Sequence, residues 1–207
     1  MKTLRYVLFT LPLLMVCCDK PAIAQSHDHP TDAAASTAAK AAPTEAQRSF
    51  ALMKTLAGSW SGNATLDPPM KGTEKAKLDV SIRVASRGNT IVHELQEADT
   101  PLDATKYDHP VTMLYMDNDQ LTLVHYCDAG NRPRMTGKLS PDGKSVEFSF
   151  VDVAGPTKYG NMHDGKFTIV DDNHHIEDWT FVLPGNKAMH AHMDLYRKPE
   201  TVASVGK

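Results

Sequence analysis

The sequence predicts an all-β protein: an antiparallel up-and-down barrel of about ten strands with a short N-terminal helix. Three observations predict it. From Trp60 onward, apolar residues alternate with polar ones, and turn residues recur about every 8–12 positions. No stretch between these segments has the helical period that the crossover connections of a parallel sheet need. A meander of this length closes best into a barrel, because closure removes the edge strands, although two stacked sheets are the alternative architecture.

The first 24 residues have the pattern of an export signal. Lys2 and Arg5 form a positive start, residues 6–18 are mostly apolar but too short to span a bilayer, and residues 22–24 read Ala-Ile-Ala. We therefore expect cleavage after Ala24 and a periplasmic or secreted bacterial protein. No membrane insertion is expected after this cleavage.

The three cysteines bear on whether the export signal is cleaved or lipidated, and on the chemistry of the remaining chain. A lipid anchor at Cys17 or Cys18 is the alternative to cleavage, but the residue before the lipidated cysteine should be small, and here it is Val16 or Cys17. Cleavage would leave Cys127, which cannot form an internal disulfide by itself. Cys127 is then either a buried apolar residue or a free, reactive thiol.

Four segments follow from composition and period. Residues 25–43 are rich in Ala, Ser and Thr and poor in large apolar residues, so we expect a disordered tether after the signal at 1–24. A barrel domain is expected at 44–199 and a flexible tail at 200–207. The domain opens at Thr44 with a short helix whose apolar residues have helical spacing and which stops at Gly58.

The strands are expected where apolar residues recur at every second position. A turn sequence rich in Gly, Asn, Asp or Pro separates many neighbouring pairs. A closed barrel of this size encloses room for one small ligand. The expected strands cover residues 60–66, 76–84, 91–95, 111–115, 121–127, 132–138, 146–150, 167–169, 179–183 and 189–195.

Charge and motifs exclude several classes of function. The net charge is −3, so no electrostatic attraction to nucleic acid is expected. The chain contains no nucleophile elbow, phosphate-binding loop, zincin helix or CxxC pair. The case for an enzyme is therefore weak.

The candidate binding residues gather around one turn. His125 and Cys127 are two positions apart on one strand, so they share a face with Leu121 and Leu123. Asn131 lies in the following turn, and Arg134 on the returning strand could meet a carboxylate or phosphate of the ligand. The alternative is a core histidine beside a buried cysteine, with a surface arginine.

Three more residues could join this cluster in a closed barrel. His93 lies between Ile91 and Leu95 on the expected inner face, His163 begins the strand that contains Phe167, and Trp179 lies on the apolar face of its strand. Three convergent imidazoles would make a metal site.

Other histidines offer weaker metal sites. His190 and His192 share the face opposite the apolar residues of the last strand, so they are expected to face solvent. Cleavage after Ala24 would place His27 third from a free amine, an arrangement that suits Cu(II) or Ni(II). The pair His174 and His175 is expected at a turn with side chains on opposite faces, which is weak evidence for any site.

The start of the domain resembles the lipocalins and other calycins. Residues 56–60 read Leu-Ala-Gly-Ser-Trp, which is similar to the Gly-x-Trp start of those barrels. The resemblance implies that Trp60 plugs one barrel end and that Arg197, from the last strand, packs over its ring.

Two families of calycin type are similar to longer parts of the chain. Residues 50–199, with the segments 125–135 and 162–167, resemble a family of uncharacterised, secreted, lipocalin-like bacterial proteins. Residues 58–62 also resemble the start of nitrobindin-like haem barrels, a likeness that implies a haem-ligating histidine near His190 or His192. The glycine-rich continuation of that family is absent at residues 63–65.

Together these features predict a binding protein for a small, partly apolar ligand with a carboxylate-like polar end. The alternatives are a barrel that binds haem or a transition metal, and a small enzyme with His125 as base or Cys127 as nucleophile.

Overall fold

The computed structural model describes residues 41–70 and 76–199. The expected signal, the tether up to residue 40, His27 and the expected tail at 200–207 lie outside the described residues. The helix α1 (Glu45–Thr55) precedes ten antiparallel strands. These strands are β1 (Gly58–Asp67), β2 (Ala76–Ala85), β3 (Thr90–Glu97), β4 (Val111–Asp117), β5 (Gln120–Tyr126), β6 (Arg132–Leu139), β7 (Ser145–Ala154), β8 (Asn161–Asp171), β9 (His174–Leu183) and β10 (Lys187–Arg197).

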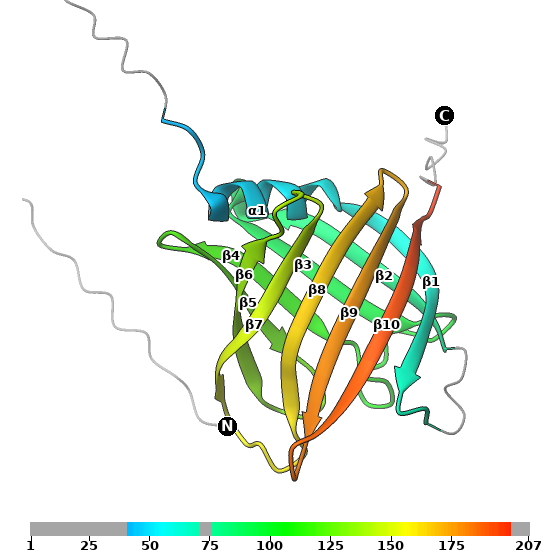
Figure 1. Ribbon diagram of the computed structural model, residues 1–207. Helices are drawn as coiled ribbons and strands as arrows, with labels where there is room; N and C mark the ends of the chain where they lie inside the picture. Colours follow the sequence, from blue (N-terminus) through cyan, green and yellow to red (C-terminus); the bar gives the residue numbers. More distant parts are fainter. Residues whose placement is uncertain (1–40, 71–75, 200–207) are drawn as a thin grey trace, which may run out of the picture. The chain divides into compact units, whose positions relative to one another are not determined.

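The strands form a closed barrel in which each one pairs with its neighbours along the chain (Figure 1). The barrel is closed by β1 and β10, whose register places Trp60 opposite Arg197. This confirms the predicted up-and-down barrel and excludes the two-sheet alternative, because the pairing runs continuously from β1 round to β10. No helix in the described part of the chain is long and apolar enough to cross a membrane.

The helix α1 begins where the sequence predicts. The Thr44 side chain accepts a hydrogen bond from the backbone N–H of Gln47, and the Gln47 side chain accepts one from the backbone N–H of Thr44. Phe50 and Met53 lie on the buried face of the helix, and they join the barrel core. The helix therefore covers one end of the barrel (Figure 1).

Trp60 seals the barrel below this helix. Its side chain is fully buried, and its indole N–H donates to the Leu56 carbonyl at 2.8 Å. The Arg197 guanidinium lies 4.1 Å from the centre of the Trp60 ring, and its Nη1 donates to the Ala57 carbonyl at 2.8 Å. A Cβ at Gly58 would come within 2.3 Å of this nitrogen, so the guanidinium leaves no room for a side chain there.

The interior changes from solid to hollow along the barrel axis. Next to α1, large apolar side chains such as Leu121, Met135 and Phe148 are almost completely buried and fill the space. Along β9, His175 packs against Trp60 near this end, with ring centroids 4.2 Å apart. Trp179 and Phe181, farther along the same strand, line a cavity instead. The opposite end of the barrel is therefore the part that can hold a ligand.

Candidate functional site

The cavity has a volume of about 460 Å³ and lies at the end of the barrel away from α1. Its wall is mostly apolar, with four methionine side chains, and it carries a few polar groups. Such a wall suits a small molecule with an apolar body. The lining residues are Met70, His93, Leu95, Asp108, Pro110, Thr112, His125, Cys127, Asp128, Met162, Trp179, Phe181, Met189 and Met193.

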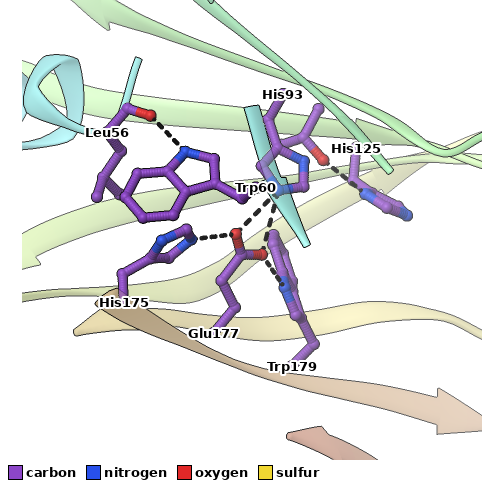
Figure 2. A network of polar contacts seen from close by, with 8 residues as sticks. Leu56, Trp60, His93, His125, His175, Glu177 and Trp179 are labelled. Atoms are coloured by element: carbon purple, nitrogen blue, oxygen red, sulfur yellow. Dashed lines mark hydrogen bonds and ion pairs between the residues drawn. The ribbon is translucent and has the colours of Figure 1, made fainter. Parts of the chain in front are cut away.

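A buried carboxylate lies behind this wall. Glu177 has no exposed surface, and three ring nitrogens surround its carboxylate (Figure 2). His93 Nε2 lies 3.1 Å from both Oε1 and Oε2. His175 Nε2 lies 3.0 Å from Oε1, and Trp179 Nε1 donates to Oε2 at 3.0 Å. Strands β3 and β9 thus place four polar side chains in one buried network.

The network keeps Glu177 ionised. Burial by itself raises the pKa of Glu177, but the charge of His93 at low pH and the hydrogen bonds from both histidines outweigh burial. The pKa of Glu177 is therefore well below its usual range. Since an ionised carboxylate can only accept hydrogen bonds, the Nε2 atoms of His93 and His175 must both carry hydrogen.

His125 stands on β5, in the same cavity wall. Its Nδ1 lies 2.9 Å from Thr112 Oγ1, and its Nε2 is buried with no hydrogen-bond partner among residues 41–70 and 76–199. Burial, followed by the charge of His93, lowers the pKa of His125 from 6.5 to about 4. The imidazole is therefore uncharged at neutral pH and offers one free nitrogen.

His93 also has a free nitrogen. Its Nδ1 is buried, and it too has no hydrogen-bond partner within the described ranges. The rings of His93 and His125 both lie beside Trp179, with centroids 6.3 Å and 5.9 Å from the indole. His175 Nδ1 is equally without a partner there, but His175 packs on Trp60 and is not among the cavity-lining residues.

Asp108, Cys127 and Asp128 form a second polar group at the mouth of the cavity. Their ligand atoms all lie within 4.8 Å of one another, which makes them the one set in the described part of the chain that could hold a metal ion. Burial, followed by the charge of Asp128, raises the pKa of Asp108. Burial also raises the pKa of the Cys127 thiol, so it is not an activated nucleophile.

The structure places Arg134 away from the cavity. Pro133 and Met135 are buried on the inner face of β6, so Arg134 between them points outward. Its Nε donates to Asp152 Oδ1 at 3.2 Å on the barrel surface. The prediction that Arg134 comes within reach of the His125 cluster was therefore wrong, and the argument for a carboxylate on the ligand loses its basis.

Asn131 and His163 are not among the lining residues either. Asn131 is buried, but its amide N–H₂ donates to the carbonyls of Pro156 and Gly160, at 2.8 Å and 2.7 Å, and so holds two loops together. His163 is half-exposed and stacks on Phe150 with ring centroids 4.6 Å apart. The expectation that either joins the His125 cluster was wrong.

The last-strand histidines face outward, as the sequence predicts. His190 Nδ1 lies 3.1 Å from Thr180 Oγ1, and His192 Nδ1 lies 2.7 Å from Asp178 Oδ1, all on the exposed side of the sheet. Neither imidazole reaches the cavity, so the haem-ligating position implied by the nitrobindin-like resemblance is not available there.

Glu177 and His175 were missed by the sequence analysis. A usable signal existed: His175, Glu177, Trp179 and Phe181 are two positions apart, so they share the inner face of β9. The expected turn at His174 and His175 was wrong, because both belong to β9. Their side chains lie on opposite faces as expected, and His175 is fully buried.

Comparison with known proteins supports the fold. No family model matches the chain, and no curated protein matches it. The solved structure of Rv2717c from M. tuberculosis is similar, with a TM-score of 0.52 and 15% identity over 73% of this chain and 98% of that one. A DUF3598 family protein of unknown function from Nostoc punctiforme has a TM-score of 0.37 and 10% identity, over 70% of this chain and 48% of that one. Because this TM-score is low, no argument is based on that structure.

The likeness to Rv2717c covers nearly all of that protein, and it supports the closed antiparallel barrel fold of this chain. At 15% identity it says nothing about which ligand this chain binds. The argument for function therefore rests on the cavity and on the buried imidazoles in its wall.

Proposed function

We propose that this protein binds a small, partly apolar molecule in the cavity of about 460 Å³. The observation that carries the proposal is the free Nε2 of His125, a buried nitrogen of an uncharged imidazole in a mostly apolar wall. A buried polar atom without a partner costs about 1–3 kcal/mol. A ligand that hydrogen-bonds to this nitrogen would recover that free energy.

A fluorescent probe tests this proposal. N-phenyl-1-naphthylamine, an uncharged apolar dye, should bind the full chain saturably with enhanced fluorescence. Met193→Trp fills the cavity and should weaken binding by at least about tenfold, since the larger ring takes the ligand's space. His192→Trp, one position away on the outer face, is the matched control and should leave binding unchanged. Equal affinity in both variants would refute binding in the cavity.

A haem-binding barrel is the second candidate, and the same nitrogen favours it. When the His125 hydrogen lies on Nδ1 and is donated to Thr112 Oγ1, the uncharged ring has its lone pair on Nε2, which is the form in which histidine ligates haem iron. His125 would hold the iron, and haem would supply redox or gas-binding chemistry. A Soret band in the purified protein that disappears in His125→Ala would support this candidate. A flat visible spectrum after incubation with hemin would exclude it.

We further propose that the protein is exported from a bacterial cell. The charged start, the apolar run and the Ala-Ile-Ala sequence at 22–24 support this. The intact mass of the protein recovered from its own host tests it. A mass matching a chain that starts at Gln25 is expected. An added diacylglycerol mass would place the anchor at Cys17 or Cys18 instead.

A further inference from the structure

We propose that the ligand of the cavity carries a positively charged amino group, and that Asp108 and Asp128 hold this group at the mouth while an apolar body lies in the cavity. The inference rests on the proposed binding function and names the class of ligand, an amine with an apolar body. Three observations carry it: the spacing of the two carboxylates, their lack of a basic partner, and the open hydrogen bond of His125 in the same cavity wall.

The spacing of the two carboxylates suits one ammonium group. Both side chains line the cavity, and an oxygen of Asp108 lies within 4.8 Å of an oxygen of Asp128. An ammonium nitrogen lies about 2.8 Å from each carboxylate oxygen to which it donates, and the tetrahedral angle between two of its N–H bonds then separates these oxygens by about 4.6 Å. One nitrogen can therefore donate to both carboxylates.

A backbone hydrogen bond holds the two carboxylates in position. Asp108 lies in the connection between β3 and β4, and Asp128 lies in the turn between β5 and β6. The backbone N–H of Asp128 donates to Asp108 Oδ1 at 3.2 Å and so fastens the two loops together. The pair is therefore in place before a ligand arrives, which reduces the entropy lost on binding.

No basic side chain in the described part of the chain neutralises this pair. The ion pairs of these residues include neither Asp108 nor Asp128, and no lysine or arginine is among the described residues that line the cavity. Burial, followed by the charge of Asp128, raises the pKa of Asp108, and the His109 imidazole acts in the opposite sense less strongly than Asp128. A cation at the mouth would offset this negative charge, whereas an anion would add to it.

A buried imidazole shows that the cavity has an open polar position as well. His125 is 4% exposed, and its Nε2 has no hydrogen-bond partner within the described ranges. Figure 2 shows this nitrogen on the side of the ring away from His93 and Trp60. Since Trp60 seals the opposite end of the barrel, the nitrogen faces the hollow part, where the ligand proposed above would lie.

The wall behind the carboxylates suits the body of an amine better than a hydrated metal ion. Trp179 and Phe181 line it, and Met162 and Met189 lie opposite Phe181 on the two neighbouring strands. Flexible thioethers and aromatic rings pack against aliphatic or aromatic bodies of varied shape. A metal ion held at the mouth would leave this apolar surface in contact with water, whereas an amine with an apolar body would cover it.

Three probes with the same apolar chain test the inference. Decylammonium, 1-decanol and decanoate differ in the charge of the head group, and their flexible chain lets this group reach the mouth. Each is titrated, below the concentration at which it forms micelles, into the full chain loaded with N-phenyl-1-naphthylamine, and the loss of fluorescence gives its Kd. Because hydrogen bonds to charged groups are stronger than neutral ones, decylammonium should bind at least about tenfold more tightly than 1-decanol. Decanoate should bind more weakly than 1-decanol, and tighter binding of decanoate than of decylammonium would overturn the inference.

Variants separate the carboxylate contact from the cavity itself. Asp108→Asn combined with Asp128→Asn keeps the size of both side chains and removes both charges. This double variant should reduce the preference for decylammonium over 1-decanol to within about twofold, while 1-decanol still binds and reports that the barrel has folded. Asp117→Asn combined with Asp119→Asn removes the same charge beside the turn between β4 and β5, outside the cavity lining, and should keep the preference. A full preference in the double variant at the mouth would overturn the inference.

Failure of the inference and failure of the proposed function give different results. If neither the dye nor any of the three probes binds the wild-type protein, the proposed binding function fails. If the dye binds but decylammonium has no advantage over 1-decanol, only this inference fails. Elemental analysis of the purified protein tests the remaining occupant. A stoichiometric metal ion that is lost in the double variant at the mouth would overturn the inference, because the two carboxylates would then be metal ligands.

Discussion

Glu177→Gln is the sharpest test of the buried network. The substitution keeps size and shape but replaces one acceptor oxygen with an N–H₂ group. The Trp179 N–H can only donate, so the remaining oxygen must stay with it and with His93. The new N–H₂ group then faces His175 Nε2, which must become an acceptor. The hydrogen of His175 has to move to Nδ1.

The cost follows from that move. His175 Nδ1 is buried and has no partner in the described part of the chain, so an N–H placed there would be unsatisfied, at about 1–3 kcal/mol. The two hydrogen bonds that remain on the oxygen lose their charge assistance, at about 1 kcal/mol each. Burying a neutral amide instead of a charge offsets part of this. We expect a net loss of about 3 kcal/mol in the free energy of unfolding.

Urea unfolding at pH 7 measures this loss. The midpoint should fall while the m-value stays constant. Glu94→Gln is the matched control, because Glu94 is exposed and pairs only loosely with Arg83, at 3.6 Å. It should change stability by less than about 0.5 kcal/mol. A loss below about 1 kcal/mol for Glu177→Gln, or a gain, would refute the reasoning about the network.

Three further predictions concern other parts of the barrel. Because the pKa of His125 is about 4 in the folded protein and about 6.5 when unfolded, only the unfolded state gains this proton between these values. Stability should therefore fall by about 3 kcal/mol as pH drops from 6.5 to 4, and His125→Phe, unlike His192→Phe, should flatten this fall in pH-dependent urea curves. Cys127 should react slowly with a disulfide reagent at neutral pH, since burial raises the pKa of its thiol. If the folded protein were labelled as fast as the urea-unfolded protein, this prediction would be wrong. Arg197→Met should lower the free energy of unfolding by about 1–3 kcal/mol, because the contact with the Trp60 ring and the hydrogen bond to the Ala57 carbonyl are lost. Arg134→Met, the control, breaks only an exposed ion pair with Asp152 and should cost less than about 1 kcal/mol. Thermal unfolding of both variants measures the difference.

Local pattern determined the elements of this protein. Period-two alternation marks a strand because successive side chains point to opposite faces, so the ten strands could be predicted. Thr44 predicted the helix start because its hydroxyl can cap the first turn. The inward positions of His93, His125 and Trp179 followed from the same alternation, without knowledge of any neighbour.

The same alternation predicts an outward position for Arg134. The residue was expected at the cavity because it returns close to His125 after a short turn. Its neighbours Pro133 and Met135 take the inner face, so its own side chain must point outward. Proximity along a hairpin does not bring a side chain to the right face of the sheet.

The sequence by itself determined which side chains point inward, because that depends only on the covalent geometry of each strand. Only the tertiary structure decided which of them meet. His93 and Glu177 are 84 positions apart on strands that are not neighbours, so closure of the barrel and its register set their 3.1 Å contact. The same closure left the end away from α1 hollow, since the large core side chains pack the opposite end.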